Sequence, residues 1–422
     1  MRSYSVAPAA AQPPPPPQTT RPVVAYHLFA SAALVFAIVI VGGLTRLTES
    51  GLSITEWNPG FKGMHLPMSD EEWQVEFDKY AQTPEFQVLN RNMTRDEFKT
   101  IFLWEWSHRV LGRVIGVAFV LPAIFFSVRP GYTTSSVRWK LLAIGAGIGF
   151  QGLLGWIMVK SGLRNPYEDD KMSERKNEWT PRVSHFRLAA HLGAAFAVYM
   201  GMLYTGIKIL RDNSAVKKGG AATDALVQLL DNPRVRRFRS LAVVLTTLVF
   251  GTAMYGAFVA GLDAGLVYNE FPTMGDGRVL PPMDELLNKR YAVNIPQISD
   301  ESAAVAFGNL TLNPVTIQAV HRVLGISSLA ALIVYARYAK KIRSILPRAS
   351  RAFAVGASHM GIVQVGLGIA TLIYLVPIPL ASLHQCGSLV ILSLLTGVLA
   401  TTKRPAQALR AFARASKQTN TH

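Results

Sequence analysis

The stretch His108-Arg-Val-Leu-Gly112 returns unchanged as His321-Arg-Val-Leu-Gly325, at an offset of 213 residues. A second block keeps the same offset, because Gln151-Gly-Leu-Leu-Gly155 corresponds to Gln364-Val-Gly-Leu-Gly368. Two blocks in one register indicate an internal duplication, and such a repeat defines an architecture before any other feature. The sequence therefore predicts two copies of one structural unit.

Each copy contains four apolar stretches long enough to cross a bilayer whose hydrocarbon core is about 30 Å thick. The eight predicted spans are 24–44, 102–126, 138–159, 185–210, 240–262, 315–338, 352–375 and 380–402. Of the 422 residues, 50% are hydrophobic and 16% are charged, which excludes an ordinary soluble protein. Four helices per copy keep both copies in one orientation, related by an axis along the membrane normal. The predicted fold class is an all-α integral membrane protein, with eight transmembrane helices as two pseudo-twofold-related four-helix bundles.

The composition between the spans divides the chain into five predicted segments. Residues 1–22 are a Pro-rich tail that we expect to be disordered. Residues 23–212 form the N-terminal bundle, and residues 240–402 form the C-terminal bundle. A basic linker, 213–239, joins the bundles on the inner side, where a basic tail, 403–422, also lies.

The net charge of +17 would suggest nucleic acid if the protein were soluble. However, 24 of the 43 Lys and Arg residues, against three of the 26 acidic residues, fall at the termini, in the loops after the second, fourth and sixth spans, or in the span ends that adjoin these loops. The positive-inside rule places these segments in the cytoplasm or the mitochondrial matrix. We therefore expect lipid headgroups, and no nucleic acid, opposite this charge.

Four histidines occupy matched positions in the second and fourth spans of the two copies: His108, His191, His321 and His384. Each lies within about the first two turns of a span that runs from outside to inside, which places all four in the outer half of the membrane. Two facing imidazoles in a four-helix bundle are typical axial ligands of haem iron. A two-His metal site without haem fits less well, because no carboxylate or thiolate recurs beside each pair. A quinone site stays open.

The two copies differ beside these histidines. Glu105 precedes His108 by three residues and shares its helix face, whereas the equivalent residue in the second copy is Gln318. A carboxylate beside one site indicates one reactive site and one electron-transfer site. The alternative is an interfacial acid that pairs with Arg109 or Arg46.

Three arginines lie at the outer ends of spans: Arg46 and Arg109 in the first copy, and Arg322 in the second. Guanidinium groups suit the propionates of haem, so these residues are candidate ligands of the haem at each site. Anchoring to lipid headgroups is the alternative.

Five stretches together resemble the haem A synthase family, in its mitochondrial and alphaproteobacterial type known as Cox15. They are Gly42-Gly-Leu-Thr-Arg-Leu-Thr-Glu-Ser-Gly-Leu-Ser-Ile-Thr-Glu-Trp57, Glu105-Trp-Ser-His-Arg-Val-Leu-Gly-Arg113, Ala260-Gly-Leu-Asp-Ala-Gly265, Phe271-Pro-Thr-Met-Gly275 and His321-Arg-Val-Leu-Gly325. The resemblance spans residues 24–402. It implies oxidation of the C8 methyl group of haem O to a formyl group, through successive hydroxylations, to make haem A for cytochrome c oxidase.

The resemblance also implies roles for single residues. His321 and His384 would ligate a resident haem b in the C-terminal half, and His108 and His191 would hold the substrate haem O. Glu105 would be the catalytic carboxylate.

The implied partners are an electron donor, of ferredoxin type or another, together with haem O synthase and cytochrome oxidase assembly factors. A homo-oligomer stays open. We expect a multi-pass protein of the mitochondrial inner membrane with both termini in the matrix, or of a bacterial plasma membrane with cytoplasmic termini. Many bacterial family members carry a cysteine pair in an outer loop. This sequence holds one cysteine, Cys386, within the last span, so that electron route is unavailable.

Two other classes of protein compete with this interpretation. A dihaem b-type transmembrane electron carrier would need both histidine pairs and would perform no chemistry on the haem. A haem transporter or assembly chaperone would not need Glu105.

Overall fold

The computed structural model describes residues 16–58, 60–163, 181–292 and 300–419, so most of the predicted tail 1–22 lies outside the described residues. Within these ranges all regular elements are helices. The fold class predicted from the sequence is confirmed.

Eight helices are long and apolar enough to cross a membrane, and each contains nearly all of one predicted span. They are α1 Pro22–Leu47, α4 Arg95–Val128, α5 Ser135–Gly162, α6 His185–Lys217, α8 Pro233–Gly261, α11 Pro314–Lys341, α12 Arg348–Ile373 and α13 Ile378–Thr401. The eight predicted spans are therefore confirmed.

Helix α4 begins seven residues before its predicted span. Thr94 and Glu97 form a capping box there, in which each side chain accepts a hydrogen bond from the backbone N–H of the other residue. The first turns of α4 therefore extend beyond the apolar part of the helix and reach the helices that cover this end of the molecule.

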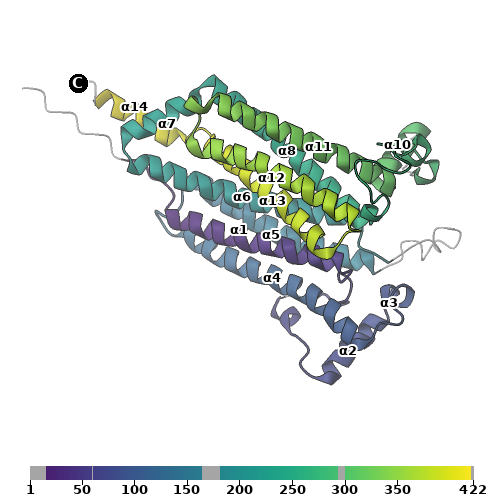
Figure 1. Cartoon of the computed structure of the whole chain (residues 1–422). Coiled ribbons are helices and arrows are strands. Elements are labelled where there is room, and N and C mark those ends of the chain that lie inside the picture. The colour runs from purple at the N-terminus through teal and green to yellow at the C-terminus, as the bar shows by residue number, and fades with distance from the viewer. Residues whose placement is uncertain (1–15, 59, 164–180, 293–299, 420–422) are drawn as a thin grey trace, which may run out of the picture.

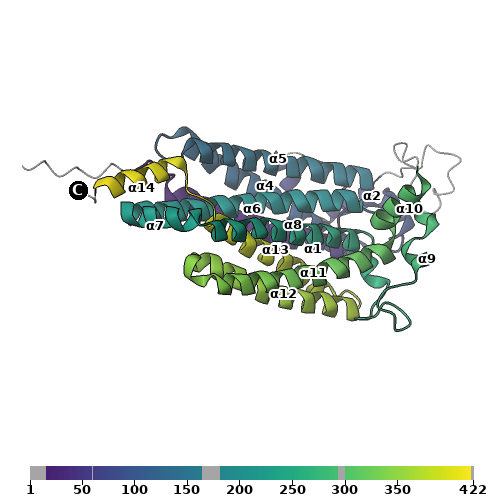
Figure 2. The same ribbon diagram turned by 90° about the horizontal axis from the view of Figure 1, so that it is seen from above.

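The eight long helices form two groups of four (Figures 1 and 2). Helices α1, α4, α5 and α6 pack together, as do α8, α11, α12 and α13. The two groups meet where α1 and α6 contact α13, and where α6 contacts α8. In α13 half of the most apolar window is buried, against 6% in α5. Helix α13 is thus central, and α5 presents its apolar surface outward, as a lipid-facing helix does.

Shorter elements lie at the two ends of the bundle (Figure 1). We call one end the cap end; there α2 Asp70–Ala81 and α3 Pro84–Val88 lie on the side of α4, and α9 Met283–Leu286 and α10 Glu301–Leu312 lie on the side of α11. The opposite, tail end carries α7 Gly220–Asp231 and α14 Gln407–Thr419. Short 3-10 turns cover Gly60–Met64, Ala264–Leu266, Lys289–Tyr291 and Arg343–Ile345.

The predicted basic linker and the predicted basic C-terminal tail are largely helical. The stretch 213–239 contains the end of α6, all of α7 and the start of α8. Within 403–422, α14 packs on α7 through Leu409 and Ala413, whose side chains are buried. Leu409 and Ala413 lie four residues apart and so share one helix face, while Arg414 and Lys417 are exposed.

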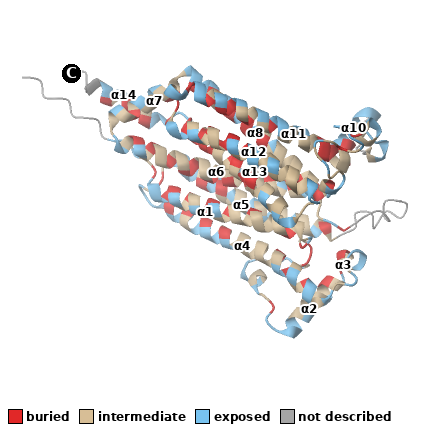
Figure 3. Ribbon diagram, viewed as in Figure 1, coloured by how far each residue is buried: buried red, intermediate tan, exposed pale blue. Residues whose placement is uncertain are grey.

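Burial alternates along the long helices, with buried faces turned toward neighbouring helices and exposed apolar faces turned away (Figure 3). The described start of the chain lies at the tail end, where Thr19 Oγ1 donates to Asn213 Oδ1 at 2.9 Å. The start of the described chain and α14 therefore lie at the same end, as an even number of spans requires.

Candidate functional site

The four repeated histidines form two pairs with matching geometry. His108 of α4 faces His191 of α6, and His321 of α11 faces His384 of α13. In both pairs the ring centroids are 6.4 Å apart, and the ring planes are steeply inclined, at 69° and 84°. The duplication seen in the sequence is thus a duplication of two-imidazole sites.

The spacing of the rings suits one metal ion between them. A point midway between two centroids 6.4 Å apart lies about 3.2 Å from each, so a ring nitrogen directed at that point would be about 2 Å from an ion there, the usual metal–imidazole bond length.

Two imidazoles alone are too few ligands for a protein-bound zinc or similar ion. Within the described ranges, no group of three or more His, Cys, Asp and Glu side chains could hold a metal ion. A haem removes this shortage because the porphyrin supplies the four equatorial nitrogens. The chemistry of the donor set therefore fits haem iron better than a bare metal ion.

The second ring nitrogens also distinguish these sites from ordinary packing. The Nδ1 atoms of His108, His191 and His321 are buried and have no hydrogen-bond partner among the described residues. His384 Nδ1 lies 3.1 Å from the carbonyl oxygen of Gln364. Buried polar atoms without partners are costly and therefore uncommon in ordinary packing.

Each imidazole packs against a glycine of a neighbouring helix. A Cβ atom added to the glycine would lie 2.7 Å from the ring Cε1 for Gly42 and His108, 3.6 Å for Gly155 and His191, 3.1 Å for Gly256 and His321, and 2.8 Å for Gly368 and His384. Gly155 and Gly368 belong to the repeated second block. Gly42 and Gly256 lie in the first helix of each copy, where the repeat is too weak to identify them from the sequence.

The repeated glutamines donate hydrogen bonds to the backbone of two of these histidines. Gln151 Nε2 donates to the backbone carbonyl of His191 at 3.2 Å, and Gln364 Nε2 donates to that of His384 at 2.8 Å. The second repeated block therefore fixes the backbone of the fourth helix in each bundle at the level of its histidine.

Glu105 is buried, with 3% of its surface exposed, and every contact of its carboxylate is with a donor. Its Oε2 accepts hydrogen bonds from Ser53 Oγ and from the backbone N–H of Ile54, both at 2.8 Å. Its Oε1 accepts from Arg109 at 2.6 Å, in an ion pair. Arg109 also donates to the backbone carbonyls of Ile54 and Glu56. Glu105 and Arg109 together hold the segment after α1 against α4.

Gln318 occupies the equivalent place in the C-terminal half but meets acceptors. Its Nε2 donates to the carbonyls of Ala264 and Tyr268, at 2.8 and 3.2 Å, and its Oε1 accepts from Arg322 at 3.1 Å. Arg322 also donates to the carbonyls of Thr273 and Tyr268. The backbone around each residue therefore matches its chemistry: donors surround Glu105 and acceptors surround the Gln318 amide group.

The three predicted propionate ligands all have partners within the protein. Arg109 and Arg322 contact the outer segments as described, and Arg46 forms an ion pair of 2.8 Å with Asp263 of the C-terminal half. Arg322 still has a buried Nε without a partner in the described structure. The sequence analysis missed Arg113, whose Nη1 is also buried and unpartnered. Its counterpart in the second copy, Ile326, is a signal that could have identified it.

Comparisons with known proteins agree with this architecture. The family model described as COX15-CtaA, cytochrome oxidase assembly protein, matches residues 25–396. The protein "Heme A synthase COX15" of Saccharomyces cerevisiae is 44% identical over 374 residues, which cover 88% of this chain and 73% of the relative.

Two further relatives differ in how much of their own length this chain covers. A "Heme A synthase-mitochondrial ferredoxin fusion protein" of Schizosaccharomyces pombe is 43% identical over 88% of this chain and 58% of the fusion. A bacterial "Heme A synthase" of Rhodospirillum centenum is 38% identical over 96% of this chain and 94% of the relative. With a family model that matches most of its length, this chain belongs to the COX15-CtaA family of cytochrome oxidase assembly proteins.

Proposed function

We propose that this chain is a haem A synthase, which oxidises the C8 methyl group of haem O to a formyl group and so makes haem A for cytochrome c oxidase. The observation that carries the proposal is the pair of matched two-imidazole sites with a buried carboxylate beside only one of them. The names of the relatives in yeast and in bacteria support the same activity.

The N-terminal half, residues 23–212, is the proposed substrate half. His108 and His191 would hold the iron of haem O, and Glu105 lies one turn before His108 on α4. Each hydroxylation is balanced as R–CH3 + O2 + two electrons + two protons → R–CH2OH + H2O, and a second round gives a hydrated aldehyde that loses water. The reaction therefore needs two protons per round at the substrate, and Glu105 is the proposed group that delivers them.

The ion pair with Arg109 and the two bonds from Ser53 and Ile54 hold the Glu105 carboxylate in one place. Such fixed donors keep the group oriented without reorganisation during the reaction. Arg46, Arg109 and Arg113 are the cations available near the cap end of this half for the substrate's propionates.

The C-terminal half, residues 240–402, is the proposed electron-transfer half. His321 and His384 would hold a resident haem b, with Arg322 as a cation near its propionates. When bound, this haem supplies one-electron transfer. The Gln318 side chain is a neutral amide that does not ionise near neutral pH, so the chain itself provides no acid or base at this position.

The electron donor is proposed to be of ferredoxin type, because one relative is a single chain named as a fusion of a haem A synthase and a mitochondrial ferredoxin. The tail end, with its basic α14, is proposed to face the mitochondrial matrix, or the cytoplasm of a bacterium, according to the positive-inside rule. Haem O synthase and assembly factors of cytochrome oxidase are the proposed further partners.

The test is conversion by the purified protein. The protein in detergent or nanodiscs receives haem O, a reduced ferredoxin and oxygen, and the haems are then extracted and identified by chromatography and mass. Haem A and its hydroxylated precursor are the expected products. A dihaem electron carrier would return two b-type haems and leave added haem O unchanged, which would overturn the proposal.

A further inference from the structure

The cap end holds a second buried carboxyl group that the proposed reaction has not used. Glu85 lies in α3 with 6% of its surface exposed. Its Oε2 accepts a hydrogen bond of 3.1 Å from the hydroxyl of Tyr80, which is fully buried in α2. Among the described residues Glu85 has no ion-pair partner, so its charged form would be buried without compensation. Such a carboxyl group is unusual in a structural role.

The groups that face Glu85 are neutral or acidic. Tyr80 of α2 donates to it, and the carboxylates of Glu105 in α4 and of Glu49 in the segment after α1 act on it electrostatically. Burial raises the pKa of Glu85 to about 7; the hydrogen bond from Tyr80 lowers that pKa, and Glu105 and Glu49 raise it further. Glu85 therefore gains and loses its proton near neutral pH, unlike an ordinary glutamate.

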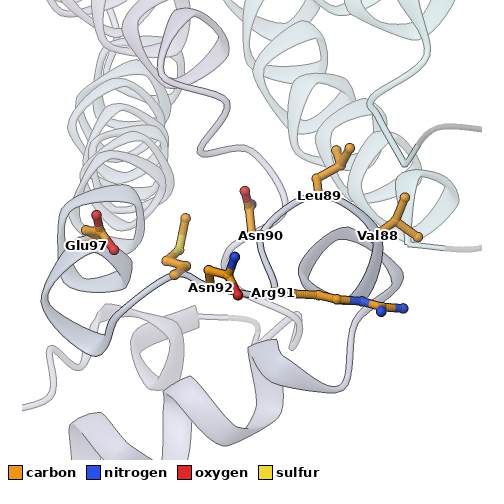
Figure 4. Close-up of a pocket in the computed structure, with 7 residues that line it drawn as sticks. Val88, Leu89, Asn90, Arg91, Asn92 and Glu97 are labelled. Atoms are coloured by element: carbon orange, nitrogen blue, oxygen red, sulfur yellow. The ribbon is translucent and has the colours of Figure 1, made fainter.

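An open polar cavity lies beside this cluster. It has a volume of about 450 Å³ and lies at the turn between α3 and α4, lined by Val88, Leu89, Asn90, Arg91, Asn92, Met93 and Glu97 (Figure 4). Most of these residues are exposed. Asn90 belongs both to the wall of the cavity and to the buried cluster, because its Nδ2 donates to the hydroxyl of Tyr80 at 2.7 Å.

Hydrogen bonds thus lead from Asn90 in the cavity wall through Tyr80 to Glu85, and Glu85 lies within electrostatic reach of the Glu105 carboxylate. We propose that Glu85 carries protons from the aqueous phase at the cap end to Glu105. Glu85 gives its proton toward the Glu105 carboxylate and takes another from water in the cavity, while Asn90 and Tyr80 hold it in place. The proposal rests on the proposed function, in which every hydroxylation consumes two protons.

Glu85 acts here through Glu105 and is not itself a catalytic residue. In the described structure the two carboxyl groups share no hydrogen bond, so the proposed transfer would need a bridging water. Removal of the Glu85 carboxyl group should therefore slow proton transfer to Glu105 without abolishing it, because other waters can partly replace that group.

The first test replaces Glu85 by Gln. The amide oxygen can still accept from Tyr80, so the fold and the haem content are expected to stay as in the unchanged protein. Haem A formation is expected to fall by at least about tenfold, because the amide cannot exchange a proton. Asp78→Asn, an exposed carboxylate of α2 in the same cap, is the matched control and is expected to leave the rate unchanged.

The pH profile separates proton supply from a structural role. Glu85 is protonated below its pKa of about 7, so the rate should fall as the pH rises through that value. In Glu85→Gln this limb should disappear. In Tyr80→Phe, which removes a hydrogen bond that lowers the pKa of Glu85, the limb should move to higher pH. A reduced rate with an unchanged limb, or an unchanged rate, would overturn the proposal.

A measurement without turnover keeps this proposal distinct from the proposed function. Infrared difference spectra of the purified protein, taken from well below to well above neutral pH, should contain a carboxylic-acid band that titrates near pH 7 and is absent from Glu85→Gln. If this band titrates as expected while haem O is not converted, the proposed function fails and the titration of Glu85 stands. If haem A forms and no such band exists, the proton path fails alone.

Discussion

The two halves of the molecule share the same arrangement of histidines, glycines and glutamines, and they differ in one functional group beside the histidines. Both hold two imidazoles with centroids 6.4 Å apart, both seat each imidazole against a glycine, and both tie the fourth helix with a glutamine. The first half then places Glu105 where the second places Gln318. In the proposed function, the shared arrangement would position a haem in each half, and the carboxyl group of Glu105 would distinguish the half that oxidises haem from the half that transfers electrons.

The hydrogen-bonding groups around Glu105 and Gln318 also differ between the two halves. Donors from Ser53 and Ile54 meet the Glu105 carboxylate, whereas the carbonyls of Ala264 and Tyr268 meet the Gln318 amide. The arginine one turn later is present in both halves and contacts both residues. Exchanging Glu and Gln at either position therefore changes the chemistry of the site and also replaces a side chain whose donors and acceptors match the surrounding backbone groups.

The largest expected effect comes from removing a haem ligand of the second half. His321→Ala should abolish the low-spin haem spectrum of that site, because low-spin iron there would need both imidazoles, and should stop haem A formation, because electron transfer through that haem would be lost. Visible absorption and the haem-to-protein ratio measure this. His359→Ala, an exposed histidine of α12, is the control and should change neither. An unchanged spectrum in His321→Ala would remove this residue from the site.

Glu105→Gln should come next, with a loss of about 100-fold or more in the rate of haem A formation. The second half shows that a glutamine in this position can accept a hydrogen bond from the following arginine, so haem content should persist. Rate and haem content are measured on the same preparation. Near-normal turnover would mean that Glu105 only anchors the segment after α1.

The reverse exchange, Gln318→Glu, should chiefly affect stability. It places a carboxylate against the carbonyls of Ala264 and Tyr268 and removes two donated hydrogen bonds, which should cost about 1–3 kcal/mol despite the nearby Arg322. Thermal unfolding in detergent, compared with the unchanged protein, measures the loss. Equal or higher stability would contradict the matching of backbone and residue described above.

The smallest expected effect concerns the glycines that seat the imidazoles. Gly42→Ala should weaken retention of haem in the first half severalfold, because the new methyl group would lie 2.7 Å from His108. Gly155→Ala is the matched control in the same half, since its methyl group would lie 3.6 Å from His191, an ordinary contact. Haem titrations that give similar affinities for both variants would show that Gly42 does not position the ring.

The sequence was sufficient to predict the eight spans, the four histidines and the contrast between Glu105 and Gln318, because apolar runs and exact repeats are local features. It did not predict Gly42, Gly256 or the link between Arg46 and Asp263, which depend on contacts between helices distant in sequence. The buried state of Glu85 also comes from tertiary packing, since α3 has only five residues and too short a pattern to predict which face is buried. Helix α14 was detectable, because Leu409 and Ala413 have helical spacing within a basic tail.

One measurement tests most directly whether the first half binds the substrate haem O and the second half binds haem b. Haem O, reduced ferredoxin and oxygen are supplied to His108→Ala and to His321→Ala, and the haem retained by each is extracted and identified by mass. We predict that His108→Ala retains haem b without haem O or haem A, and that His321→Ala retains unconverted haem O without haem b. The same kind of haem in both variants, or haem A formed by His108→Ala, would contradict the account.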